Sequence, residues 1–141
     1  MTAKEYLKQY ERAVKRVQRY RQQYEDESAL IDSVRSLSDN DGMPHGSNIS
    51  KPTEDKAIRL ADRRLRLIKA ELEAIKVKQD LFDFIDGIDG VEGDVLYHRY
   101  IRLLKWEQIC LIVNYSWPNT MRIHKRALDI VQHKIDDVEI E

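Results

Sequence analysis

The fold is decided by the stretch at residues 95–128, VLYHRYIRLLKWEQICLIVNYSWPNTMRIHKRAL. Its apolar residues recur in steps of three and four, which is typical of helices with one packed face. Asn114 tolerates the left-handed conformation that ends a helix, and Ser116 is a preferred first residue for the next one. Pro118 suits the first turn, where its missing N–H is not needed. The stretch therefore predicts three helices, at about 94–103, 106–113 and 117–134.

The predicted helices bury one side of each. The inward residues are expected to be Leu96, Tyr97, Tyr100, Leu104, Trp106, Ile109, Cys110, Val113, Ile123, Ala127, Leu128 and Val131. Tyr115 is expected to plug the turn between the second and third helices. Because only about three residues join those helices, they should cross steeply, as in a helix-turn-helix.

A helix-turn-helix presents the N-terminal outer face of its last helix to the major groove of DNA. Five side chains are candidates for reading bases there: Trp117, Asn119, Met121, Arg122 and Lys125. Asparagine can pair bidentately with adenine and arginine with guanine. A second group is suited to phosphate contacts, which position a protein without reading sequence. These candidates are Arg99, Arg102, Lys105, Ser116, Thr120, His124 and Arg126.

Charge is segregated along the chain, although the net charge is only −1. Residues 95–128 hold six basic side chains and a single acidic one, Glu107. The segments on either side, 81–94 and 129–141, are rich in Asp and Glu. A basic module between acidic ones attracts phosphate more strongly than the total charge suggests.

The same module resembles region 4 of σ70 factors. The residues that carry the resemblance are Arg99-Tyr100-Ile101, Trp106-Glu107-Gln108-Ile109, Tyr115-Ser116 and Arg122-Ile123-His124-Lys125-Arg126-Ala127-Leu128. The match covers about 35 of the 141 residues. Two positions depart from the pattern, since Cys110 stands where alanine is usual and Asn114 replaces the turn glycine.

The rest of the chain narrows this resemblance. A coiled-coil-like N-terminal part before such a module is similar to the ArpU/RinA-like late transcription regulators of phages of Gram-positive bacteria. The resemblance implies activation of packaging, morphogenesis or lysis genes. Nothing in the chain matches σ region 2, which melts promoter DNA, so the resemblance favours an activator over a stand-alone σ factor.

Two long helices are predicted before the module. The first runs from Thr2 to about Leu37, with apolar residues at Tyr6, Tyr10, Ala13, Val17, Tyr20, Tyr24, Ile31 and Val34. Residues 38–53 hold many Gly, Pro, Asn, Asp and Ser residues and predict a long loop. The second helix starts near Thr53 and carries a heptad pattern typical of coiled coils. Its apolar positions are Ile58, Ala61, Leu65, Ile68, Leu72, Ile75 and Phe82.

This heptad face has two interpretations. In one, the two long helices pack on each other through it as an antiparallel hairpin. In the other, the face forms a homodimer or meets a partner protein. The predicted class is therefore all-α, with a helical hairpin at 1–88, a helix-turn-helix module at 94–135 and an acidic tail at 136–141. A short hinge is predicted between the hairpin and the helix-turn-helix module, at Asp86, Gly87, Asp89, Gly90 and Gly93. The spacing of the acidic residues is not that of a calcium-binding EF-hand, so a calcium site is not predicted there.

Composition argues against several classes of protein. Hydrophobic residues make up 42% of the chain, yet no apolar run reaches the roughly 18 residues of a membrane span. The single cysteine, Cys110, excludes an internal disulfide and fits the bacterial cytoplasm. The four histidines show no metal-binding spacing, and no phosphate loop or nucleophile–base pair appears. We therefore expect no metal, cofactor, small-molecule substrate or enzymatic activity.

The sequence leaves three functions open. The first is a transcription activator that binds double-stranded DNA and uses its hairpin to dimerise or to engage RNA polymerase. The second is an adaptor that binds a polymerase subunit without reading DNA. The third is a phage small terminase subunit, which would also combine DNA binding with oligomerising helices.

Overall fold

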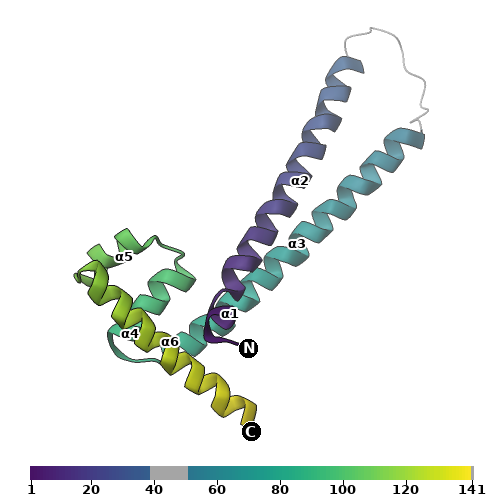
Figure 1. Cartoon of the computed structure of the whole chain (residues 1–141). Coiled ribbons are helices and arrows are strands. Elements are labelled where there is room, and N and C mark those ends of the chain that lie inside the picture. Colours follow the sequence, from purple (N-terminus) through teal and green to yellow (C-terminus); the bar gives the residue numbers. More distant parts are fainter. Residues whose placement is uncertain (39–50, 141) are drawn as a thin grey trace. The chain divides into compact units, whose positions relative to one another are not determined.

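The structure is a computed structural model that describes residues 1–38 and 51–140. These residues form six α-helices and one π-helical turn, with no strand among them (Figure 1). In chain order the elements are α1 (Ala3–Leu7), α2 (Gln9–Ser38), α3 (Lys51–Asp86), α4 (Gly90–Leu96), η2 (Tyr97–Ile101), α5 (Trp106–Val113) and α6 (Trp117–Ile140). The all-α class is confirmed. Most of the predicted loop at 38–53 lies outside the described residues.

The chain divides into two compact units. The first combines Met1–Val14 with Ala74–Glu141, and the second is Lys15–Glu73. The first turns of α2 and the last turns of α3 therefore belong to the same unit as the C-terminal module. The sequence predicts a domain boundary close to residue 88. In the structure the last turns of α3, from Ala74 onward, already belong to the same compact unit as the C-terminal helices.

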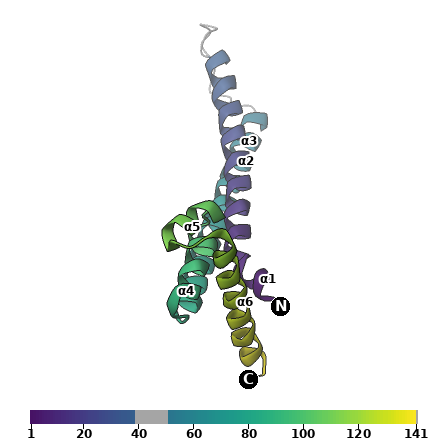
Figure 2. The ribbon, with the colours of Figure 1, turned by 60° about the vertical axis from the view of Figure 1, so that its left-hand side comes forward.

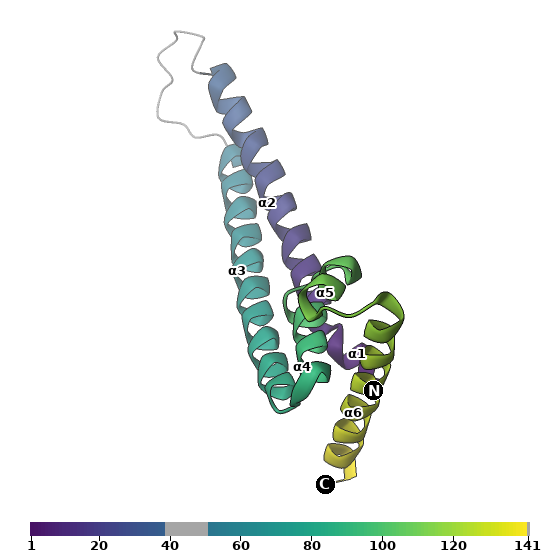
Figure 3. The ribbon, with the colours of Figure 1, turned by 90° about the vertical axis from the view of Figure 1, so that its left-hand side faces the viewer.

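In the second unit α2 and α3 lie side by side (Figures 1 and 3). The periodic face of α2 turns inward, because Val17 is buried and Tyr20 and Tyr24 are half-buried. Two ion pairs join the helices at their edges. Arg21 Nη2 lies 3.1 Å from Glu71 Oε1, and Arg63 Nε lies 2.6 Å from Glu27 Oε2.

The first interpretation of the heptad face, as the surface through which α3 packs on α2, is wrong. Its heptad residues are exposed, with Ile58 67% and Leu72 61% accessible. A second set with the same spacing, two positions further along, is covered instead: Leu60, Arg63, Leu67 and Ala70. This set contains a small residue and an ion-pairing arginine. The covered face thus combines apolar side chains of different size with an arginine that pairs with Glu27 of α2.

The N-terminus forms part of the first unit. Thr2 and Glu5 form a capping box, with Glu5 N–H donating to Thr2 Oγ1 at 3.3 Å and Thr2 N–H donating to Glu5 Oε2 at 3.0 Å. The prediction of one continuous helix from Thr2 is wrong at Lys8, where a turn separates α1 from α2. Ala3 and Leu7 of α1 are buried in the core of this unit.

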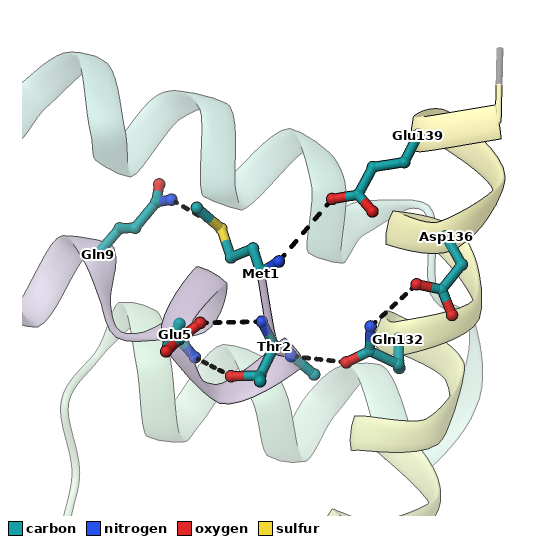
Figure 4. A network of polar contacts seen from close by, with 8 residues as sticks. Met1, Thr2, Glu5, Gln9, Gln132, Asp136 and Glu139 are labelled. Carbon is teal, nitrogen blue, oxygen red and sulfur yellow. Dashed lines mark hydrogen bonds and ion pairs between the residues drawn. The ribbon is translucent and has the colours of Figure 1, made fainter.

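Short polar contacts tie the N-terminus to α6 (Figure 4). The Ala3 N–H donates to Gln132 Oε1 at 2.9 Å, and the amino group of Met1 lies 3.9 Å from Glu139 Oε1. Helix α6 extends to Ile140, so the predicted acidic tail is helical up to that residue. The N-terminal segment is thus a structural part of the module that was predicted from residue 94 onward.

The predicted hinge after α3 is shorter than expected. Helix α4 already starts at Gly90, which has φ 83°, so the bend ends at that residue and Gly93 lies inside the helix. Gly93 packs directly on the preceding turn, because a Cβ added there would overlap the Ile88 carbonyl oxygen. Glycine at this position allows α4 to fold back tightly after α3. Helices α4, α5 and α6 then pack on one another (Figure 2).

Candidate nucleic-acid interface

The connection between α5 and α6 is three residues long. Asn114 ends α5 in the left-handed conformation, with φ 60° and ψ 43°, as predicted. Its position allows the Tyr115 N–H to donate to the Cys110 carbonyl at 3.2 Å. Ser116 Oγ then accepts from the Asn119 N–H at 3.5 Å, which caps α6. This local chemistry sets where α6 begins and therefore which of its residues stand at its N-terminal end.

A small apolar core supports the three helices. Val95, Ile109 and Ile123 are almost fully buried together, with Trp106 and Val113 packed against them. Of the predicted inward residues, Leu96, Tyr100, Ile109, Ile123, Ala127 and Val131 are buried, and the others are half-buried. Tyr115 is 45% exposed, so the prediction that it plugs the turn is wrong. It lines the outer surface instead.

The first turns of α6 carry the predicted base-reading residues. Trp117, Asn119, Arg122 and Lys125 are exposed, while Met121 is half-buried. A shallow groove runs along this part of the molecule, and its lining includes Val91, Tyr115, Asn119, Arg122, Lys125 and Arg126. Arg122 Nη1 donates to Asn119 Oδ1 at 3.3 Å. This contact holds two hydrogen-bonding side chains next to each other on the surface, where they can meet the edges of two neighbouring bases.

The predicted phosphate contacts fall into two groups. Arg102, Lys105, Ser116 and Arg126 are exposed. Arg126 lies near an acidic partner, with Nε 3.8 Å from Glu92 Oε1, and its side chain remains 64% accessible. Arg102 contacts His98 Nδ1 at 3.0 Å through Nη1. These side chains can reach a phosphate with little rearrangement.

The other group is held inside the module. Thr120 is fully buried and donates from Oγ1 to the Ser116 carbonyl at 2.9 Å, so its side chain is not available to phosphate. Arg99 is half-buried, donates to the Leu104 carbonyl at 3.0 Å and lies over the Trp106 ring at 4.8 Å. Both residues stabilise the module from within.

His124 also packs inside. Its Nε2 is 2.7 Å from Tyr100 Oη, and its ring lies edge-on to Trp106 with centroids 4.7 Å apart. Burial, with a smaller effect of the cations Lys4 and Arg99, lowers the pKa of His124 to about 4. His124 is therefore neutral at pH 7 and brings no charge to a phosphate contact.

A polar pocket beside His124 includes residues that the sequence did not indicate. Lys4 and Lys8 line it together with Arg99, Tyr100 and Trp106. The two lysines come from the N-terminal segment, far earlier in the chain than the π-helical turn. No local pattern could have placed them there, because they reach the module only through the docking of α1.

No protein family, no curated protein and no solved structure matches the chain. In the described part of the chain, no helix is both long and apolar enough to cross a membrane. Residues 1–38 and 51–140 also contain no cluster of His, Cys, Asp or Glu side chains that could hold a metal ion.

Proposed function

We propose that this protein is a sequence-specific, DNA-binding transcription regulator. In this proposal α5 and α6 act as a helix-turn-helix, and the first turns of α6 enter the major groove. One observation carries it. Asn119, Arg122 and Lys125 are exposed on α6 directly after a three-residue connection from α5. Amide and guanidinium groups at the start of such a helix are suited to reading adenine and guanine.

The distribution of charge supports the same function. Lys125 and Arg126 add exposed positive charge along the groove, and Lys105 is exposed just before α5. Contacts to phosphates dominate the affinity of proteins for DNA. Contacts of this kind would position the module, while Asn119 and Arg122 would supply the preference for particular bases.

The resemblance to σ70 region 4 and to phage late regulators makes the proposal more specific. On that basis the regulated genes would be phage packaging, morphogenesis or lysis genes, and the protein would act as an activator. The hairpin formed by α2 and α3 would then connect DNA binding to a second copy or to RNA polymerase.

The test is a gel shift of the full chain against fragments of the genome that encodes it, at two salt concentrations and with competitor DNA. A discrete fragment that stays bound under competition is the expected result, with an affinity that falls as salt rises. The double variant Arg122→Ala/Lys125→Ala should lose this complex. Arg19→Ala, which removes an exposed arginine from α2, should keep it. Binding that is equally strong for every fragment would contradict sequence-specific regulation.

A second candidate function rests on the outer face of α5. Leu111 is 82% exposed and Ile112 is 49% exposed, and apolar side chains in this position favour a protein partner over DNA. The partner would be bacterial RNA polymerase, bound by an adaptor or by an activator already on DNA. Purified polymerase should then bind the protein, and Leu111→Ser should weaken that binding without changing the gel shift. Equal polymerase binding by the wild type and Leu111→Ser would exclude this face.

A further inference from the structure

The outward side of α3 carries an apolar stripe that the described part of the chain leaves exposed. We call the residues Ala61, Leu65, Ile68 and Leu72, all in the second unit, the outer seam. Leu65, Ile68 and Leu72 are 50%, 41% and 61% exposed. Ile58 and Ile75 continue the same spacing along the helix, and both are also exposed. Large apolar side chains at coiled-coil spacing are normally covered by another helix.

We propose that a second copy of this chain covers the outer seam, with the two α3 helices antiparallel and centred between Arg66 and Leu67. In this register Leu65 faces Ile68 of the second copy, and Ala61 faces Leu72 of the second copy. Each small residue therefore meets a large one, so the layers fill evenly. Ile58 would face Ile75 of the second copy at both ends.

The charges beside the outer seam select this orientation. Antiparallel packing places Arg64 near Glu71 of the second copy, and Asp62 near Lys69 of the second copy. By symmetry each of these opposite-charge pairs occurs twice. Side chains that flank a coiled-coil core set partner choice and orientation in this way.

A parallel arrangement fits less well. It would bring Arg64 close to Lys69 of the second copy, which places like charges side by side. It would also put Ala61 opposite itself, which leaves space unfilled in that layer. The self-complementarity of charge and size in the antiparallel register is what identifies the occupant as a second copy.

Glu71 and Asp62 also make contacts within their own chain, but both can still pair with a second copy. Glu71 Oε1 is already 3.1 Å from Arg21 Nη2, but a carboxylate has two oxygens and can accept from a second donor. Asp62 pairs with Arg66 on the same helix at 3.4 Å, and both side chains are more than half exposed. A surface pair of this kind is weak and exchanges partners readily.

Sedimentation equilibrium of the full chain without DNA tests the association independently of the proposed function. The wild type should be a dimer, and Leu65→Ser/Leu72→Ser should raise the dissociation constant by about tenfold or more. Because both leucines are exposed in the single chain, far-ultraviolet circular dichroism should show the same helix content. Leu30→Ser removes an equally exposed leucine from α2 and should leave the dimer intact. A monomeric wild type, or a double variant that dimerises as well as the wild type, would overturn the proposal.

Lys69→Glu tests the orientation. In the antiparallel dimer this variant places a carboxylate beside Asp62 of the second copy and should weaken association. In a parallel dimer the same carboxylate would face Arg64 of the second copy and strengthen association. Asp62→Lys should also weaken association alone, and mixing the two variants should restore a heterodimer. An increase in dimer stability for Lys69→Glu would contradict the antiparallel register.

A distance measurement provides a second readout of orientation. A spin label at Lys56→Cys, on a Cys110→Ala background, should lie about 30 Å from its counterpart in the antiparallel dimer, given a rise of about 1.5 Å per residue. A parallel dimer would remove this axial offset and leave only the lateral separation of labels on two helices whose axes lie roughly 10 Å apart. The shorter distance would rule out the proposed register.

Discussion

Tyr100 Oη lies 2.7 Å from His124 Nε2 and joins the π-helical turn to α6. Both groups are largely withdrawn from water. Burial lowers the pKa of His124 to about 4 and raises the pKa of Tyr100 to about 12. The pair therefore stays uncharged in the folded protein over the whole neutral range.

This pair predicts a loss of stability in mild acid. In the unfolded chain the histidine takes up its proton near pH 6.5, whereas the folded chain resists protonation until about pH 4. The unfolded state thus binds more protons in this window, and stability falls as the pH drops from about 6.5 to 4. Since the side chain is partly accessible, we expect a loss of about 1–2 kcal/mol.

Urea unfolding at several pH values would measure this effect. His124→Gln should remove much of the slope between pH 6.5 and 4. His133→Gln, which changes an exposed histidine on the same helix, should keep the wild-type slope. An unchanged slope in His124→Gln would mean that another group is responsible.

Gly93→Ala should destabilise the protein strongly. The added Cβ would overlap the Ile88 carbonyl oxygen, which is backbone and cannot move aside without displacing α4. We expect a loss of about 2–4 kcal/mol, measured as a lower Tm. Gly87→Ala is the matched control. There the nearest atom is the mobile Lys134 Nζ at 3.1 Å, and a loss as large as that of Gly93→Ala would contradict the steric explanation.

Leu103→Gly should be more stable than Leu103→Ala. Leu103 has φ 56°, in the left-handed region where a side chain costs about 1–2 kcal/mol and glycine costs nothing sterically. Its side chain is only 37% exposed, and both variants lose its burial to nearly the same extent. Only glycine also relieves the backbone strain, so we expect its free energy of unfolding to exceed that of the alanine variant by about 0.5–1 kcal/mol, after the entropy cost of glycine.

The same pair of substitutions at Leu111 is the control. Leu111 is 82% exposed and lies within α5, where glycine should be about 1 kcal/mol less stable than alanine. Thermal unfolding should therefore rank glycine above alanine at residue 103 and alanine above glycine at residue 111. A Leu103→Gly protein that is less stable than Leu103→Ala would contradict the backbone strain at Leu103.

Arg122 and Arg126 should differ in their effect on DNA binding. Arg122→Ala should weaken binding to the preferred site by about 1–3 kcal/mol and relax the preference at one base pair. Arg126→Ala should weaken binding to all sequences alike and reduce the salt slope by about one. Binding isotherms on matched and scrambled sites at several salt concentrations separate the two effects. Equal losses on both sites for Arg122→Ala would assign it to the phosphate backbone.

Local features of this protein could be predicted from its sequence. The all-helical class follows from periodicity. The end of α5 follows from Asn114, and the start of α6 follows from Ser116. The exposure of Asn119, Arg122 and Lys125 follows from their positions on a helix whose other face is apolar. Helix caps and periodicity act within a few residues, so one stretch of chain contains what is needed.

Which candidate side chains are buried, and which distant residues lie beside them, was decided only by the tertiary structure. The pattern around Thr120 suggests a surface hydroxyl, yet its Oγ1 donates to the Ser116 carbonyl inside the module. Lys4 and Lys8 lie beside His124 only because α1 docks against α6. Contacts between residues so far apart in sequence leave no mark on local periodicity.

Helix α3 shows the same division most clearly. Its sequence carries two apolar faces with the same spacing, one through Leu65 and Leu72 and one through Leu67 and Ala70. Periodicity predicts that a helix forms, and the larger residues make the first face the expected contact for α2. The tertiary structure buries the second face, because close packing depends on how side chains from both helices fit together and not on hydrophobicity alone.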